Sequence, residues 1–387
     1  MNKKGREIAV VGVGYSNVYR GPSPSVEALT TTACLAAIED SGLTAKDIDG
    51  IFEYQIGNES PKALYVQGAL GCADLAAYAD IMGTGPSGLA GVLAAIAAVS
   101  AGTCETALAY RSIEQNAGNT GTAQTMVSMA GSSPLHDEMV NPFGMFGVIP
   151  SIAMRMKRRQ KEYGGREEDY GLIALNARVW ASQNERAVQR NLLTMDDYLQ
   201  SKVLCEPLRL LDCDYPVSGS CAVIITTLER ARDLRQKPVV VSGHSYGTGS
   251  GDWLHGDDFL YGGKINCAKR LWDRSGMTPA DMDVAQLYDG FTYVTLTWLE
   301  ALGFCPLGEA GRWLDNGRTI GPGGSLPMNT NGGQLAEGRL HGVSFLAEAV
   351  QQLRGLNGSR QVHGAKNAVV ATSTGPQCGA MILTNQT

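Results

Sequence analysis

A chain of 387 residues is longer than one ordinary domain, so two packed halves are the default expectation. Its 44% hydrophobic content provides ample core, and its net charge of -6 leaves no broad basic surface for nucleic acid or an anionic membrane. The nine cysteines are odd in number and include no Cys-x-x-Cys pair, which argues against a disulfide framework or a zinc site and for reduced thiols in the cytoplasm.

The N-terminal segment passes from a few basic residues into an apolar strand, Ile8 to Val13, which is far too short for the apolar core of a signal peptide. The apolar run from Leu89 to Ala101 is about half as long as a membrane span and is flanked by glycines. We therefore expect a soluble protein with no targeting segment and no membrane insertion.

A short segment occurs twice. Ser41 to Asp49 and Ser275 to Asp283 match at Ser, Gly, Thr and both Asp, with a constant offset of 234 residues. Each copy follows an expected helix and leads into an apolar strand. An internal repeat at this offset predicts two similar halves.

Other segments follow the same offset. In each half, a run of β-forming residues that ends in glycine is predicted to be the first strand. These runs are Glu7 to Gly14 and Lys237 to Gly243. In each half a glycine-rich turn later opens an apolar helix that leads into a strand. These pairs are Gly83 to Ala101 with Glu105 to Tyr110, and Gly332 to Leu353 with Asn367 to Thr372. The alternation predicts α/β layers with sheets buried on both faces, in halves that span residues 1–230 and 231–387.

The alternation stops between residues 111 and 211. The segment Gly118 to Pro150 is rich in Gly, Ser, Met and Pro, and charged helices such as Glu168 to Arg190 follow it. An insertion of this length within a half caps a site, makes an interface or is a surface elaboration.

The stretch from Asn329 to Gly342 has the composition of an active-site loop. Its four glycines allow a backbone that turns sharply and lies close to a ligand, and Arg339 and His341 are its side chains able to carry positive charge. The stretch opens the apolar helix Val343 to Leu353. Taken alone, such a stretch is also compatible with a glycine-rich surface connection.

Two motifs and the duplicated halves resemble the thiolase superfamily, in its sterol-carrier-protein-X-type branch. The motifs are Glu206 to Gly219 and Asn331 to Gly338. The resemblance covers nearly the whole chain. It implies the five-layered αβαβα thiolase fold with an inserted loop domain, a homodimer, and a substrate carried as a coenzyme A thioester.

The resemblance also shows where this chain departs from a thiolase. The position of the nucleophilic cysteine falls at Gly85, so covalent acyl transfer by the thiolase route is excluded on this alignment. Arg339 stands where the second thiolase motif has its histidine. The segment Tyr288 to Phe291 corresponds to the third motif, and the C-terminal catalytic cysteine would fall near Ser373.

Four segments of the second half are similar to the thiolase-like aldolases of bacterial steroid side-chain degradation. They are Tyr288 to Thr292, Leu299 to Cys305, Gly308 to Arg312 and Glu337 to Gly342. That similarity implies retro-aldol cleavage of a β-hydroxyacyl-CoA. It also implies a small partner protein with a zinc ribbon and an OB-fold. Of the pair of tyrosines implicated in that group, Tyr288 fits one, and Arg339 stands at the other position.

Retro-aldol cleavage needs a base at the hydroxyl and stabilisation of the thioester enolate, and it needs no nucleophile. Tyr288 is the expected base, because a cation such as Arg339 within about 4–6 Å would lower its pKa from ~10 by roughly one to three units. Arg339 would also donate to the enolate oxygen. His341 is the alternative base, or it only binds a backbone carbonyl.

Five further positions are expected at the substrate. Gly85 and Ser87 lie in the turn before the first apolar helix, Gly333 lies in the glycine-rich loop, and the resemblance places the backbone N–H of Gly379 near the thioester. Tyr293 either contacts the substrate or, because it lies about one helical turn after Tyr288, packs in the protein interior. Beside Tyr288, Asp289 orients a loop or caps the helix that begins near Phe291, and we expect the capping role.

We predict no metal, because the histidines and cysteines show no ligand spacing, and no cofactor beyond the coenzyme A of the substrate. Two other functions remain open. A non-catalytic scaffold that binds acyl-CoA within a larger complex would explain the missing cysteines. An acyltransferase would need another nucleophile such as Ser87.

Overall fold

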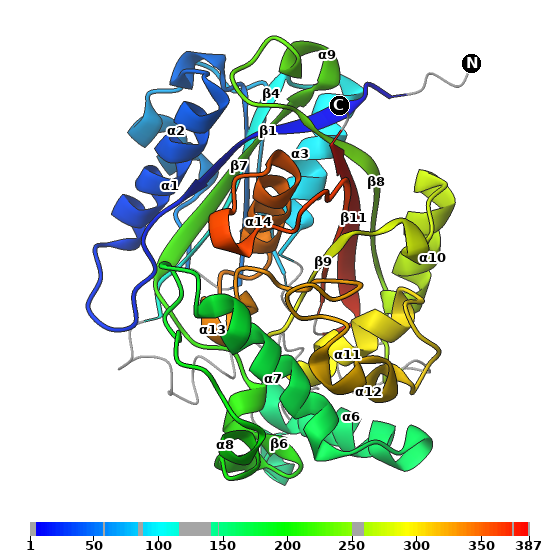
Figure 1. The fold of residues 1–387 in the computed structure, drawn as a ribbon. Coiled ribbons are helices and arrows are strands. Elements are labelled where there is room, and N and C mark those ends of the chain that lie inside the picture. Colours follow the sequence, from blue (N-terminus) through cyan, green and yellow to red (C-terminus); the bar gives the residue numbers. More distant parts are fainter. Residues whose placement is uncertain are drawn as a thin grey trace.

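The computed structural model describes residues 5–56, 59–83, 88–115, 141–145, 147–249, 259–373 and 375–385. Its strands form a nine-stranded sheet in the order β3-β2-β4-β7-β1-β8-β11-β10-β9 and a small sheet of β5 and β6. In Figure 1 the long strands run through the upper part of the molecule, and α6, α7 and α8 lie at its lower end.

The first half contains β1 (Ile8–Tyr15), α1 (Val26–Ser41), β2 (Gly50–Gln55), α2 (Ala63–Leu70), β3 (Ala77–Met82), α3 (Ala90–Ala101), β4 (Thr106–Ile113), β7 (Gly219–Thr227) and α9 (Leu228–Ala231). Between β4 and β7 come α6 (Val148–Tyr163), α7 (Glu167–Ala181), α8 (Met195–Leu199), β5 (Val203–Cys205) and β6 (Leu208–Arg209). The second half contains β8 (Val239–Thr248), α10 (Lys264–Ser275), β9 (Val284–Leu287), α11 (Thr292–Ala301), α12 (Ala310–Trp313), α13 (Gly333–Ala336), α14 (Val343–Arg354), β10 (Asn367–Thr372) and β11 (Gln377–Asn385). Short 3₁₀ turns are η1 (Ala45–Asp47), η2 (Asn141–Phe143), η3 (Leu210–Asp212), η4 (Pro279–Asp281), η5 (Asp315–Gly317) and η6 (Gly358–Arg360).

The order of the large sheet is mirrored about the contact between β1 and β8. Outward from that contact the first half runs β1, β7, β4, β2, and the second half runs β8, β11, β10, β9, which are its corresponding strands. β3 extends the first half by one further edge strand. The joint itself is short, with Ala9 opposite Val240 and Val10 opposite Val239. The sequence repeat therefore corresponds to two sets of strands with the same topology.

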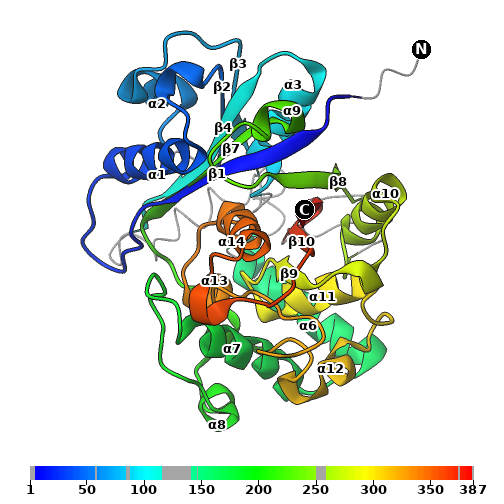
Figure 2. The ribbon, with the colours of Figure 1, turned by 45° about the horizontal axis from the view of Figure 1, so that its top comes forward.

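Alternate residues of β1 enter different cores. Ala9 and Val11 pack in a cluster that contains α1, whereas Ile8 and Val10 pack in the main core that contains α3 and α14. On the other side, α10 covers β8 and β11. In Figure 2, α14 lies between β1 of the first half and β9 and β10 of the second. Helices thus lie outside and between two layers of strands, which is the predicted five-layered αβαβα architecture.

The repeated segment has the same structural role in both halves. Gly42 and Gly276 adopt left-handed φ values of 79° and 68° and end α1 and α10. The threonine and the first aspartate of each copy then form a capping box at a 3₁₀ turn. The carboxylate of Asp49 accepts the backbone N–H groups that open β4, and that of Asp283 accepts those that open β10. The identical residues are therefore those that connect a helix to its strand.

The inserted region lies under the ends of the strands. β4 continues to Ile113, so the departure from the layered fold begins after residue 113 and not at 111, because Arg111 still pairs within the sheet. α7 packs against α11, α12 and α13 of the second half (Figure 1). Residues 116–140 lie outside the described residues, and the expected boundary at 230/231 falls within α9. Among the described helices, none has the length and apolar character needed to cross a membrane.

Candidate active site

The glycine-rich loop from Asn329 to Gly342 brings the two halves together. A Cβ on Gly88, just before α3, would lie 1.2 Å from the carbonyl oxygen of His341, so no larger residue fits there. A Cβ on Gly342 would lie 2.7 Å from Cγ2 of Thr372 at the end of β10. The turn before α3, the loop before α14 and the end of β10 therefore meet. Gly85 and Ser87 themselves lie outside the described residues.

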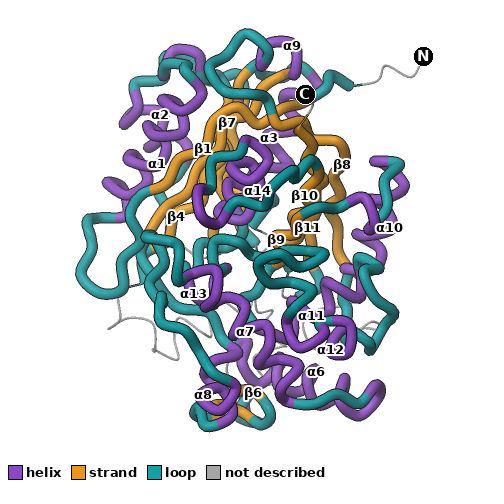
Figure 3. The backbone as a smooth tube through the Cα atoms, viewed as in Figure 1, coloured by secondary structure: helices purple, strands orange, loops and turns teal. Residues whose placement is uncertain are grey.

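Tyr288 follows β9 and is fixed by its neighbours. Its backbone N–H donates to the carbonyl of Ala371 at 2.8 Å. The side chain of Asn329 exchanges two hydrogen bonds of 2.8 Å with the backbone of Leu287. The Tyr288 ring meets that of Phe345 edge to face with centroids 6.4 Å apart, and 2% of the residue is exposed. Figure 3 shows the loop segments around β9, α11 and α13 between the strands and the inserted helices.

Arg339 is held by side chains of the first half. Its Nη1 lies 3.3 Å from Oδ1 of Asp214, and its Nε donates to Oε1 of Gln115 at 3.1 Å. Nη2 donates to the same oxygen of Gln115, and the backbone N–H donates to the carbonyl of Tyr215 at 3.0 Å. The side chain remains 19% exposed. The planar fork of donors is therefore oriented while part of it stays accessible.

The expected phenolate at Tyr288 is not what the surroundings favour. Burial raises the pKa of Tyr288 well above its ordinary value, and the carboxylate of Asp214 raises it further. Arg339 lowers this pKa, as predicted, but it opposes the other two effects only in part. The pKa prediction fails because it left out the depth of burial and the carboxylate paired with the arginine. Tyr288 is a neutral phenol near neutral pH, able to donate a hydrogen bond.

Asp214 is the functional candidate that the sequence interpretation missed. It precedes β7, and its backbone N–H donates to the carbonyl of Gly290 at 3.1 Å. A Cβ on Gly290 would lie 2.7 Å from the hydroxyl oxygen of Tyr288, so Gly290 lies against both residues. Burial raises the pKa of the Asp214 carboxyl to about 6, although Arg339 lowers it. The available signal was a second aspartate within the motif from Glu206 to Gly219.

His341 faces a cation on the buried strand β4. Nη2 of Arg111 lies 2.9 Å from Nδ1 of His341, and Arg111 also forms an ion pair with Glu59. Because a guanidinium can only donate, Nδ1 accepts and the proton of the imidazole is on Nε2. Burial, followed by the charges of Arg111 and Arg339, lowers the pKa of His341 well below its ordinary value. His341 is thus a neutral donor, and the alternative prediction of a base is not supported.

The residues next to Tyr288 serve the scaffold. Tyr293 is 1% exposed and its hydroxyl donates to the carbonyl of Leu260 at 2.6 Å, which is the packing role. Oδ1 of Asp289 accepts the backbone N–H of Gln334 at 2.8 Å, at the start of α13. The preferred assignment of Asp289 as the cap of α11 is wrong, because Phe291 occupies that cap position.

Two other predicted contact positions are enclosed by backbone and side chains. A Cβ on Gly333 would lie 1.8 Å from Oδ2 of Asp289, so this glycine faces a carboxylate. Gly379 lies within β11, opposite Thr372 of β10 and Tyr246 of β8. The side chain of Ser373, expected at the position of a catalytic cysteine, donates to the carbonyl of Gly375 at 2.8 Å.

The cysteines offer no activated thiol near this loop. Burial raises the pKa of Cys104 to about 12, and it also raises the pKa of Cys72. Cys378 is buried in β11 and donates to the carbonyl of Gly247. Within the described ranges, no group of three His, Cys, Asp or Glu side chains is arranged to hold a metal ion.

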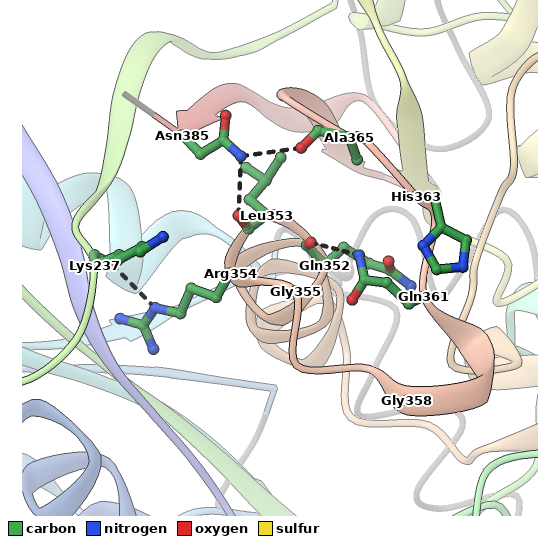
Figure 4. A pocket seen from close by; sticks show the side chains of 11 residues that line it. Lys237, Gln352, Leu353, Arg354, Gly355, Gly358, Gln361, His363, Ala365 and Asn385 are labelled. Carbon is green, nitrogen blue, oxygen red and sulfur yellow. Dashed lines mark hydrogen bonds between the residues drawn. The ribbon is translucent and has the colours of Figure 1, made fainter. Parts of the chain in front are cut away.

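A separate cavity of about 500 Å³ lies at the far end of α14 (Figure 4). Lys237, His363 and Asn385 are among its lining residues. Arg354 also lines it, but its guanidinium pairs with Asp40 at 2.8 Å. The full length of α14, roughly 18 Å at 1.5 Å per residue, separates this cavity from Arg339. It is therefore distinct from the cluster of Tyr288, Arg339 and Asp214.

Comparison with known proteins identifies the class. Residues 254–385 match the family described as thiolase C-terminal domain-like. The chain is 33% identical to the 17-hydroxy-3-oxo-4-pregnene-20-carboxyl-CoA lyase of Mycobacterium tuberculosis, over 97% of this chain and 99% of that protein. It is 32% identical to the steroid side-chain-cleaving aldolase of Thermomonospora curvata, over 97% of each chain. A solved Ltp2-ChsH2(DUF35) aldolase superposes with a TM-score of 0.89 at 29% identity, covering 99% of this chain and 98% of that one.

The fold is that of the thiolases. The chain belongs to the thiolase superfamily, in its branch of thiolase-like aldolases.

Proposed function

We propose that this chain is a carbon–carbon lyase that cleaves a β-hydroxyacyl-CoA, a steroid side-chain thioester, to an acyl-CoA and a ketone or aldehyde. The relatives named above as a coenzyme A lyase and a side-chain-cleaving aldolase support the substrate class. The observation that carries the proposal is the cluster of Tyr288, Arg339 and Asp214. It provides proton-transfer and oxyanion-binding groups, and burial raises the pKa of the neighbouring thiol, Cys213, above its ordinary value.

In this reaction the β-hydroxyl loses its proton, the bond between Cα and Cβ breaks, and its electron pair forms the thioester enolate. A proton is then returned to Cα, so the reaction is balanced without a nucleophile or an oxidant. We propose that Tyr288, Arg339 and His341 contact the substrate. The neutral phenol of Tyr288 donates to the β-oxygen, and Arg339 and Nε2–H of His341 donate to the enolate oxygen.

The turn that contains Gly85 and Ser87 is proposed to lie along the thioester, since its described end, Gly88, contacts His341. No cofactor is needed beyond the coenzyme A of the substrate, because proton transfer and charge stabilisation are the whole of the chemistry. The reduced state of nine free cysteines supports a cytoplasmic location.

We further propose a homodimer formed through β3. This strand is at the edge of the large sheet, and Tyr78 and Met82 on its outer face are 55% and 64% exposed. An exposed strand edge with apolar side chains pairs readily with a second copy. A small protein with a zinc ribbon and an OB-fold is the proposed second partner. The solved relative described as an Ltp2-ChsH2(DUF35) aldolase supports a complex of this kind.

The decisive experiment is to incubate the purified chain, alone and with its partner, with β-hydroxyacyl-CoAs of steroid and straight-chain type. Release of a ketone or aldehyde together with the shortened acyl-CoA is the expected result, and it is measured by mass spectrometry. Tight binding of the thioester without cleavage under both conditions would instead identify a non-catalytic scaffold. Transfer of the acyl group to an added thiol would identify an acyltransferase.

A further inference from the structure

The proposed reaction requires a proton acceptor, and neither of the two expected bases is suited to that role. Tyr288 is a neutral phenol, and Nδ1 of His341 already accepts from Arg111. The candidates include three carboxylates around the loop, the buried Asp289 and Glu337 and Asp214, whose side chain is 7% exposed. They can be compared by the lone pairs that the protein already occupies and by the exposure of their side chains.

Both carboxylate oxygens of Glu337 accept hydrogen bonds. Its Oε1 accepts from Nδ2 of Asn184 at 3.0 Å and from Nε of Arg186 at 3.3 Å. Its Oε2 accepts from Nδ2 of Asn331 at 2.5 Å, and 1% of its side chain is exposed. A carboxylate that orients two amides and a guanidinium in this way positions the loop, and it has no access to a substrate.

Asp289 is also enclosed. One oxygen accepts the N–H of Gln334 that opens α13, and the other, Oδ2, faces the backbone of Gly333 and has no hydrogen-bond partner among the described residues. The residue has no exposed surface. Its carboxyl therefore fixes the loop from beneath and cannot reach a substrate hydroxyl.

Asp214 differs from both. The hydrogen bond that its side chain makes within the described residues is the one from Nη1 of Arg339, at 3.3 Å, and 7% of its side chain is exposed. Its backbone is bonded to Gly290, which lies against the hydroxyl of Tyr288, and its charge raises the pKa of Tyr288. The Asp214 carboxylate therefore keeps lone pairs unoccupied by the described residues, next to a partly exposed guanidinium and close enough to the phenol of Tyr288 to affect its pKa. These are the neighbours that the hydroxyl and the carbonyl of a β-hydroxy thioester require.

We propose that Asp214 is the general base, accepting the proton of the substrate's β-hydroxyl while the phenol of Tyr288 donates to the same oxygen. This role rests on the proposed lyase function. As the O–H bond breaks, the C–O bond becomes a carbonyl and the pair of electrons from the Cα–Cβ bond enters the thioester enolate held by Arg339. The protonated Asp214 then supplies a proton that returns to Cα through Tyr288, which restores the carboxylate.

The charge of Asp214 depends on the groups that face it. These are Arg339 from the loop before α14, Tyr288 and Asp289 from the segment after β9, and Cys213 beside it in the chain. Of these, Arg339 is the one that favours the carboxylate, and with it the pKa of Asp214 is about 6. Turnover should therefore fall as the pH drops through about 6, because the base becomes protonated.

Asp214→Asn is the most informative variant. Its amide oxygen can still accept a hydrogen bond from Arg339, but the amide cannot act as a base. We expect turnover to fall by about 10²–10⁴-fold with little change in the Michaelis constant, and the acid limb of the pH profile to disappear from the residual rate. Asp214→Glu keeps a carboxylate and should retain the acid limb. Asp40→Asn is the matched control, because it also removes a charge paired with an arginine, at the far end of α14.

The outcomes separate the two proposals. An inactive wild-type protein, with and without its partner, would overturn the lyase function and the role of Asp214 together. An active wild type with an Asp214→Asn variant that keeps its rate and its acid limb would overturn only the role of Asp214. If Asp214→Asn and Asp40→Asn lower turnover equally and both keep the acid limb, Asp214 is structural.

Discussion

Nη2 of Arg111 and Nδ1 of His341 lie 2.9 Å apart, although 230 positions separate the two residues in the chain. The contact joins β4 of the first half to the glycine-rich loop of the second, and it determines which nitrogen of the imidazole carries the proton. A histidine held in this way is a constant donor, and its charge does not change near neutral pH.

The first prediction concerns the effect of His341 on stability. Its pKa in the folded protein is well below the value of ~6.5 expected in the unfolded chain, so below that pH the unfolded state takes up a proton that the folded imidazole does not. Relative to His341→Gln, the wild type should lose up to about 1.4 kcal/mol of unfolding free energy per pH unit below pH ~6. Urea denaturation of both proteins across this range measures the difference. A constant difference between the two proteins at all pH values would contradict a neutral His341 in the folded protein.

Tyr288→Phe should lower turnover by about 10²–10⁴-fold, because the hydroxyl that donates to the β-oxygen is lost. The ring and its edge-to-face contact with Phe345 remain, so the melting temperature and the affinity for the thioester should change little. Steady-state kinetics and thermal denaturation test both expectations. Wild-type turnover in this variant would remove Tyr288 from the mechanism.

Arg339→Met should affect both turnover and its pH dependence. The pKa of Asp214 rises when its cation is removed, so the acid limb should move to higher pH while the maximal rate falls. Arg339→Lys should recover only part of the rate, since an ammonium cannot reproduce the planar fork that binds Gln115 and Asp214 together. A change confined to the Michaelis constant would show that Arg339 only anchors the substrate.

Gly88→Ala tests the contact between the halves. Its new methyl group would overlap the carbonyl of His341, so the loop must move, and we expect a loss of stability of about 1–3 kcal/mol together with reduced turnover. Gly68→Ala in α2 is the control, because its methyl group meets nothing within 4 Å. It should stabilise the protein by about 0.5–1 kcal/mol at unchanged activity. Equal melting temperatures for the two variants would contradict the close approach.

The sequence was most informative where local patterns determine structure. The matching residues of Ser41 to Asp49 and Ser275 to Asp283 predicted the duplication because each forms a cap or a turn contact that depends on near neighbours in the chain. Tyr288 and Arg339 were predicted as site residues from the family resemblance.

The pKa values and protonation states of the site residues could not be predicted from such local sequence patterns. The pKa of Tyr288 depends on burial and on Asp214, which is far away in sequence and close in space. The proton position on His341 depends in turn on Arg111 in a strand of the other half. Such long-range pairs have no sequence pattern, because nothing local constrains which side chains meet across two packed layers.

The position of β1 has a consequence for how the chain folds. This strand pairs with β7 on one side, where Ile8 lies opposite Thr227, and with β8 on the other, where Ala9 lies opposite Val240. During synthesis β1 therefore has both of its edges unpaired until β7, which comes much later in the chain, has been made. Contacts between such distant positions slow folding, and an unpaired apolar strand is prone to aggregate. We expect the nascent chain to depend on chaperones that shield β1 until β7 and β8 emerge.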